Sequence, residues 1–339
     1  MPSGATLMMR HMTTQLVGGW WFVVGGWVRG WSFVVAGWSV LAIRRDVRHL
    51  VQMATALMML CAPAAAQTPT SLLVDVDWLS QHLSDRNLVV LHVGDRADYD
   101  AGHIPGARPI SEDDLSKPHD MARGDLMLEM PAAADLRATL ASRGISDKSR
   151  IVVYLGNGLG VQSATRVVLT LDYIGLGEQT SLLNGGLAAW SRSGKPVTRE
   201  APRVMPGTLG ARATKPLIVD AEFVKTVGSR ANHTLIDARA PVFYQGIEPT
   251  FGKNGHIPGA INIPFTDVVD GEQKIDRTRL EGLFARAGVK QGDTVVAYCH
   301  VGQQATAVIF AARLLGHPVL LYDGAFQDWA SANRGPVEK

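Results

Sequence analysis

The segment Thr294-Val295-Val296-Ala297-Tyr298-Cys299-His300-Val301-Gly302-Gln303-Gln304-Ala305 joins an apolar run to a helical pattern through a short loop that begins with a cysteine. The run 294–298 predicts a strand buried on both faces, and residues 306–315 predict the helix. Cys299 then lies where backbone N–H groups and the helix dipole converge, and we expect both to stabilise its thiolate. A buried structural cysteine is the alternative, because a free cysteine often packs as a small apolar residue.

From Leu72 onward the chain runs twice through one pattern. Each pass has an apolar strand, the turn Gly-His-Ile-Pro-Gly-Ala, a second apolar strand, a helix, and a stretch that leads to a tryptophan. In the first pass these features are residues 88–93, 102–107, 150–154, 163–171 and Trp190. In the second pass they are residues 234–237, 255–260, 294–298, 306–315 and Trp329. Such an internal duplication predicts two domains of the same fold.

Short apolar strands that alternate with helices are typical of parallel sheets covered on both faces. We therefore predict an α/β fold of two tandem domains, each a parallel sheet with helices on both faces. The predicted bounds of the domains are residues 72–194 and 217–339. Residues 195–216 are predicted to be a linker, because Pro, Gly, Arg and Thr replace the apolar periodicity there.

The first 66 residues form a predicted leader with two parts. Residues 16–43 are rich in Gly, Val and Trp, and they are either a membrane-spanning helix or upstream DNA translated from a wrongly chosen start codon. An arginine-rich stretch, 44–48, then precedes the apolar run 50–61 and the sequence Ala62-Pro63-Ala64-Ala65-Ala66. This is the layout of a secretory signal peptide cleaved after Ala66. We expect an exported protein, located in a bacterial periplasm.

The charge balance bears on the partners of the protein. The chain has a net charge of +2, and residues 1–66 hold five arginines and one aspartate, so the remainder carries a net charge of −2. No basic patch stands out, and we expect no nucleic-acid partner. A membrane partner is expected only if residues 16–43 span a membrane, and we expect a monomer. Without Cys61, Cys299 is the single thiol, and an unpaired cysteine in an oxidising compartment indicates a reactive one.

From Leu72 to its end the sequence resembles the rhodanese family of sulfurtransferases in the tandem, two-domain form. The resemblance rests on four features: the two Gly-His-Ile-Pro-Gly-Ala turns, Asp237-Ala238-Arg239, Tyr298-Cys299-x-x-Gly302-x-x-Ala305, and Tyr322-Asp323-Gly324-Ala325-Phe326-Gln327-Asp328-Trp329, with Asp328 where glutamate is usual. It implies a catalytic second domain and an inactive first domain, because Leu155 stands at the position of Cys299. The first domain would then cover one side of the active-site cleft.

The resemblance also implies the reaction and its site. Cys299 would take a sulfane sulfur from thiosulfate or 3-mercaptopyruvate as a persulfide and pass it to a thiol or cyanide acceptor. Gly302 suits the loop because it adopts a positive φ without a Cβ clash. Gln303 and Gln304 are either side-chain donors or solvated residues at the start of the helix. No cofactor and no metal ion are expected. The residues expected around the substrate are His300, Val301, Gly302, Gln303, Gln304, Ala305, Arg239 and Phe243.

Several positions depart from the family pattern. The loop has His300 and Val301 where thiosulfate sulfurtransferases place basic residues, and Phe243 stands in place of a second arginine. We expect a partly protonated His300 to attract an anionic donor, with an exposed histidine of no role as the alternative. Arg239 either pairs with nearby acids or contacts the substrate, and Lys253 would add charge from across the cleft.

Other activities compete with sulfur transfer. A non-enzymatic sulfur carrier or partner-binding rhodanese module is the main alternative. A thiol redox protein would need a second, resolving cysteine in a Cys-x-x-Cys motif, which Cys299 does not have. Phosphoryl transfer by a loop of this kind needs an arginine six residues after the cysteine, where this chain has Ala305.

His103 and His256 are expected to be structural, because their turn also occurs in the inactive half.

Overall fold

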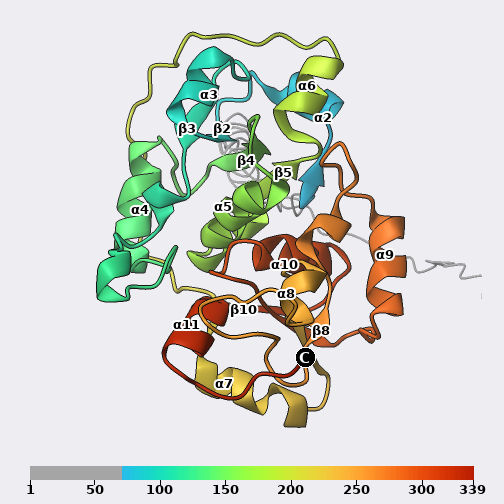
Figure 1. The fold of residues 1–339 in the computed structure, drawn as a ribbon. Coiled ribbons are helices and arrows are strands. Elements are labelled where there is room, and N and C mark those ends of the chain that lie inside the picture. Colours follow the sequence, from blue (N-terminus) through green and yellow to red (C-terminus); the bar gives the residue numbers. More distant parts are fainter. Residues whose placement is uncertain (1–70) are drawn as a thin grey trace, which may run out of the picture. The chain divides into compact units, whose positions relative to one another are not determined.

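The computed structural model describes residues 71–339, which form two α/β halves (Figure 1). The predicted leader, with Cys61, the predicted signal peptide and residues 16–43, lies outside the described residues. Each half holds a five-stranded sheet in which all neighbouring strands are parallel. The predicted fold class, two tandem parallel α/β domains, is confirmed. The predicted domain bounds, 72–194, 195–216 and 217–339, stay predictions.

The two sheets have the same strand order. The first runs β1-β5-β4-β2-β3 and the second runs β6-β10-β9-β7-β8, so corresponding strands occupy corresponding places. The strands of the first half are β1 Leu73–Val74, β2 Leu88–Val93, β3 Arg108–Ile110, β4 Arg150–Leu155 and β5 Thr180–Leu183. Those of the second half are β6 Ile218–Val219, β7 His233–Asp237, β8 Ile261–Asn262, β9 Thr294–Tyr298 and β10 Val319–Tyr322.

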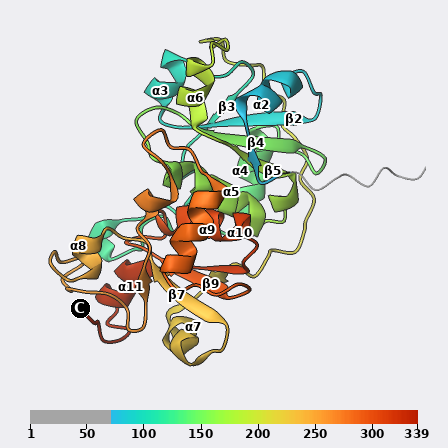
Figure 2. The same ribbon diagram turned by 90° about the vertical axis from the view of Figure 1, so that its right-hand side faces the viewer.

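Helices cover both faces of each sheet (Figure 2). In the first half α2 and α6 pack on one face and α4 and α5 on the other; in the second half α7 and α11 pack on one face and α9 and α10 on the other. The helices of the first half are α2 Val76–His82, α3 Arg96–Ala101, α4 Ala133–Ser142, α5 Val161–Tyr173 and α6 Gly186–Arg192. Those of the second half are α7 Ala221–Thr226, α8 Pro241–Tyr244, α9 Arg277–Arg286, α10 Ala305–Leu314 and α11 Ala325–Ser331. The helices predicted over 163–171 and 306–315 correspond to α5 and α10.

The two halves share one apolar core that includes residues of α5 and α10. At the contact between these helices the hydroxyl oxygens of Thr165 and Thr306 lie 2.8 Å apart. Both hydroxyls are buried, so each serves as the other's polar partner. The halves therefore meet through the helices that follow β4 and β9.

The repeated Gly-His-Ile-Pro-Gly-Ala turns are held by the same contacts in both halves. The Nδ1 atoms of His103 and His256 lie 2.8 and 2.9 Å from the carbonyl oxygens of Tyr99 and Tyr244, and each imidazole stacks on that tyrosine ring. Both histidines are buried. They have the structural, hydrogen-bonding role expected from the sequence.

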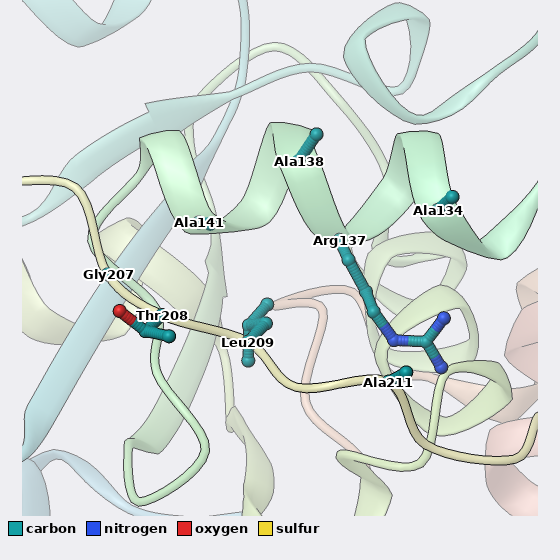
Figure 3. Close-up of a pocket in the computed structure, with 8 residues that line it drawn as sticks. All are labelled: Ala134, Arg137, Ala138, Ala141, Gly207, Thr208, Leu209 and Ala211. Carbon is teal, nitrogen blue, oxygen red and sulfur yellow. The ribbon is translucent and has the colours of Figure 1, made fainter.

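Residues 193–217, between α6 and β6, contain no helix or strand. Part of this segment lies along α4, and the two together line a cavity of about 450 Å³ (Figure 3). Its lining is mostly small residues, and no predicted site residue belongs to it: Ala134, Arg137, Ala138, Ala141, Gly207, Thr208, Leu209 and Ala211. Over residues 71–339, no helix has the length and apolar character needed to cross a membrane.

Candidate active site

Cys299 follows the last residue of β9, the middle strand of the second sheet. Ligands of parallel α/β sheets bind beyond the carboxyl ends of the strands, which is where this residue stands. Residues 299–305, the Cys299 loop, connect β9 to α10. The carbonyl oxygens of Cys299 and His300 accept the N–H groups of Phe326 and Gln327, so α11 fixes the start of the loop.

The thiol of Cys299 is fully buried, and four backbone N–H groups of the loop donate to its sulfur. They belong to Val301, Gly302, Gln304 and Ala305. The predicted convergence of N–H groups on the sulfur is therefore confirmed. Burial raises the pKa of Cys299 by more than the four donors lower it, so the donors stabilise the thiolate as predicted but the net shift of the pKa is upward.

Gly302 has the positive φ predicted for it, +82°. A Cβ atom at this position would lie 2.8 Å from the carbonyl oxygen of Asp323, so the close approach also excludes a side chain. The N–H of Gly302 faces the sulfur, while its carbonyl oxygen accepts a hydrogen bond from Arg166 Nη1 at 3.2 Å. One residue thus links the sulfur to the first half of the chain.

Arg166, in α5, is a site residue that the sequence analysis missed. Its guanidinium is almost fully buried, donates from Nη1 to Asp323 Oδ1 at 2.7 Å, and donates from Nη2 to the carbonyl oxygen of Leu128. The one signal in the sequence is an arginine inside the otherwise uncharged helical run that continues to Leu171. Its partners lie up to 157 positions away, so helical periodicity could not identify them.

Glu112, in the loop that follows β3, is a second residue from the first half that the sequence analysis missed. The side-chain amide of Gln303 donates to both of its carboxylate oxygens, at 2.9 and 2.7 Å, and lies 3.3 Å from Ser163 Oγ. Burial raises the pKa of Glu112, and the hydrogen bonds from Gln303 and Ser163 oppose that rise. Gln303 is therefore an interdomain contact rather than a solvated helix-start residue.

Gln304 has a different environment from its neighbour. Its backbone N–H donates to the sulfur of Cys299, and its side-chain Oε1 is buried without a hydrogen-bond partner among the described residues. A buried acceptor without a donor is costly. A substrate with an N–H or O–H group near the sulfur would satisfy it.

His300, in the Cys299 loop, is in contact with Phe243, in agreement with the prediction that both lie around the substrate. Their rings meet edge to face, with centroids 4.7 Å apart. The expectation of a partly protonated His300 was wrong at neutral pH. Burial first, and then the charge of Arg239, lower the pKa of His300 to about 4. The imidazole is neutral and offers a hydrogen bond rather than a charge.

Arg239 is fully buried and holds a structural position. It donates to the Asp237 carboxylate, with Nη2 and Oδ2 2.6 Å apart, and its guanidinium stacks on Phe326. Tyr298, next to Cys299, donates its hydroxyl to the same carboxylate at 2.8 Å. Of the two roles considered, pairing with an acid is the one observed. Lys253 was expected to add charge from across the cleft, but its Nζ donates to Asn333 Oδ1 at 2.7 Å.

The described residues offer no group of three or more His, Cys, Asp or Glu side chains that could hold a metal ion. The arrangement around Cys299 suits a different chemistry. A single sulfur nucleophile is surrounded by N–H donors that stabilise an anion as it forms. The position of Cys299 in the first half is taken by Leu155, which has no nucleophilic group.

Comparisons with known proteins place these observations in a family. The rhodanese-like domain matches the chain twice, over residues 75–193 and 220–332. The chain is 29% identical over 262 residues to a thiosulfate sulfurtransferase of Azotobacter vinelandii, and the aligned region covers 77% of this chain and 94% of the relative. It is 32% identical over 253 residues to the thiosulfate sulfurtransferase of Mus musculus, covering 72% and 82% of the two chains. It is 29% identical over 289 residues to the 3-mercaptopyruvate sulfurtransferase of Escherichia coli strain K12, covering 79% and 98%.

Two solved structures have similar folds. SseA from Escherichia coli, described as a 3-mercaptopyruvate sulfotransferase, superposes with a TM-score of 0.66 at 27% identity and covers 76% of this chain and 99% of its own. An anaerobic ergothioneine biosynthesis enzyme from Chlorobium limicola, in complex with trimethyl histidine, superposes with a TM-score of 0.68 at 21% identity, covering 79% and 70%. The second likeness is one of fold alone.

Proposed function

This chain belongs to the rhodanese family and is a sulfurtransferase, and we propose that it moves a sulfane sulfur from thiosulfate or 3-mercaptopyruvate to a thiol or cyanide acceptor through a persulfide on Cys299. The observation that carries the proposal is the position of the Cys299 sulfur at the end of β9, where it faces four backbone N–H donors. Such donors stabilise a thiolate and equally a persulfide anion.

The proposed cycle has two displacements. The Cys299 thiolate attacks the outer sulfur of thiosulfate, a sulfur–sulfur bond forms, and the bond to the sulfonate breaks with its electron pair leaving as sulfite. With 3-mercaptopyruvate the carbon–sulfur bond breaks instead, and the three-carbon fragment leaves as an enolate that takes a proton to give pyruvate. Cyanide or a thiolate then attacks the outer sulfur of the persulfide and regenerates the Cys299 thiolate.

The test is turnover by the protein without residues 1–66. Thiocyanate is measured with thiosulfate and cyanide, and pyruvate is measured with 3-mercaptopyruvate and a thiol. Many turnovers per protein molecule are expected from the wild type and none from Cys299→Ser. The matched control is Leu155→Ser, which removes an apolar side chain at the equivalent position of the first half and leaves the nucleophile in place.

A sulfur carrier without turnover is the second candidate. It is favoured by one observation: in residues 71–339 both arginines near the Cys299 loop, Arg166 and Arg239, are buried in ion pairs with aspartates. A carrier would show a single-turnover burst, whereas the proposed enzyme continues at a steady rate.

Export to a bacterial periplasm is part of the proposal. Support comes from the order of basic, apolar and Ala-rich segments in residues 44–66. Recovery from a periplasmic fraction of a chain that begins at Gln67 would agree with it. A chain retained in the cytoplasm with residues 44–66 attached would overturn it.

A further inference from the structure

The two halves of the chain can be compared residue by residue, because they share one fold. Helices α5 and α10 both end before a glycine with a similar positive φ, Gly175 at +88° and Gly316 at +90°. Counting back ten residues from each glycine reaches Thr165 and Thr306, whose hydroxyls touch at 2.8 Å. The count and the contact agree, so the correspondence is secure along these helices.

Some interdomain contacts occur in matching form on both sides. The Met130 N–H donates to Asp323 Oδ2 at 2.7 Å, and the Ile275 N–H donates to Asn184 Oδ1 at 2.8 Å. Asp323 and Asn184 directly follow β10 and β5. In each case a backbone N–H of one half donates to the side chain that directly follows a strand of the other half. Contacts of this matched kind hold the halves together and do not distinguish the active side from the inactive one.

Other contacts occur only on the side of Cys299. Counted without gaps from the last alanine of each repeated turn, Ala107 and Ala260, Glu112 corresponds to Phe265. The first half therefore presents a carboxylate to the active loop, whereas the second half presents a phenyl ring at the equivalent place. By the count from the helix ends, Arg166 likewise corresponds to Ala307. Both charged residues are absent from the inactive side.

The charges around the Cys299 loop do not balance. In the described part of the chain Arg166 is paired with Asp323, and Arg239 is paired with Asp237. Among the described residues Glu112 has no salt bridge; its hydrogen bonds are with Gln303 and Ser163, and the charges of Arg166 and Asp113 act on it in opposite directions. Among these five groups three carboxylates face two arginines, and the excess negative charge is that of Glu112. At a partly buried site this charge is only weakly screened.

We propose that Glu112 selects the charge of the sulfur compounds that react at Cys299, disfavouring anions and favouring donors and acceptors with little or no negative charge. The inference rests on the proposed function and deepens it. Gln303 holds the carboxylate against the loop, so its field acts on any molecule that approaches the sulfur. The thiosulfate dianion is repelled more strongly than the 3-mercaptopyruvate monoanion. The first half, without a nucleophile of its own, thereby contributes to substrate choice.

The test compares two alkylating reagents of similar size that differ by one charge, iodoacetate and iodoacetamide. Their rates of reaction with Cys299 both depend on the thiolate fraction, which cancels in the iodoacetate-to-iodoacetamide ratio. Glu112→Gln keeps the shape of the side chain and removes the charge. It is expected to raise this ratio about fivefold or more, the effect of one unit charge at a partly buried site. Asp113→Asn removes the neighbouring exposed carboxylate and is expected to leave the ratio within about twofold of the wild type, because exposed charges are screened.

The second part of the test measures kcat/KM for the two donors. Glu112→Gln is expected to raise the value for thiosulfate relative to that for 3-mercaptopyruvate. Glu112→Ala, which removes the charge and the hydrogen bond together, must move both ratios in the same direction. Circular dichroism verifies that each variant is folded.

The outcomes separate the inference from the proposed function. An alkylation ratio in Glu112→Gln equal to that of the wild type, or one that Asp113→Asn changes as much, overturns the inference whatever the turnover. A raised alkylation ratio in a protein that turns over neither donor supports the charge selection by Glu112 and overturns the proposed function. A raised ratio together with the shift in donor preference supports both.

Discussion

Arg166 Nη1 lies 2.7 Å from Asp323 Oδ1 and forms a buried ion pair between the two halves of the chain. The same nitrogen donates to the carbonyl oxygen of Gly302, inside the Cys299 loop. Removing one partner of a buried pair leaves an uncompensated charge. Arg166 therefore contributes to the stability of the protein and also holds the Cys299 loop in its conformation.

Arg166→Met is expected to lower the free energy of unfolding by about 3 to 5 kcal/mol, because Asp323 stays buried without its cation. Urea denaturation measures the loss. The control is Arg96→Met, whose partner Asp100 is on the surface, with side chains 73% and 51% exposed. Exposed pairs contribute about 1 kcal/mol or less. Equal losses in both variants would show that the buried pair is not a distinct source of stability.

Gly302→Ala is expected to abolish most of the activity and to destabilise the loop. The new Cβ meets the carbonyl oxygen of Asp323, and the positive φ is strained for alanine, at a cost of about 1 to 3 kcal/mol. Gly292→Ala is the matched control, because Gly292 has a φ of +85° but open space around its Cβ position. Thermal unfolding and thiocyanate formation are the measurements. If both variants keep full activity, the loop does not need the close approach at Gly302.

The alkylation of Cys299 is expected to depend on pH with a midpoint above about 8.5, the value of an ordinary thiol. Burial raises the pKa of Cys299, so the thiolate and the rate fall as the pH is lowered towards neutrality. The rate with iodoacetamide is followed from pH 6 to pH 10, in steps of about one unit across the range that brackets a thiol. A plateau reached already at neutral pH would mean that the four N–H donors outweigh burial.

Phe243→Arg is expected to raise kcat/KM for thiosulfate relative to 3-mercaptopyruvate by about fivefold, because it places an unpaired cation beside His300. His300 cannot supply that charge at neutral pH, since its pKa is lowered to about 4. Val242→Arg, on the exposed side of the same helix, is the control with a smaller effect. An unchanged donor preference in Phe243→Arg would place the donor away from Phe243.

The sequence predicted what local patterns determine. The repeated turns revealed the two domains, the apolar runs located β2, β4 and β9, and the loop after β9 indicated the positive φ of Gly302. These features depend on residues close together in the chain, where turn chemistry and periodicity apply directly.

The residues that the sequence analysis missed act across the interface between the halves. Glu112 and Gln303 are separated by 191 positions, and no local pattern joins them. The protonation states of Cys299 and His300 depend on how completely the folded chain buries them, and burial outweighs the N–H donors in one case and a nearby aspartate in the other. Such balances are properties of the packed structure rather than of a motif.

The measurement that tests the central claim most directly is the intact mass of the protein without residues 1–66 before and after exposure to thiosulfate and, separately, to 3-mercaptopyruvate. Cys299→Ser is treated in parallel. A gain equal to one sulfur atom, seen in the wild type with at least one donor and absent from Cys299→Ser, is the predicted result. No gain from either donor, or the same gain in Cys299→Ser, would contradict a persulfide on Cys299.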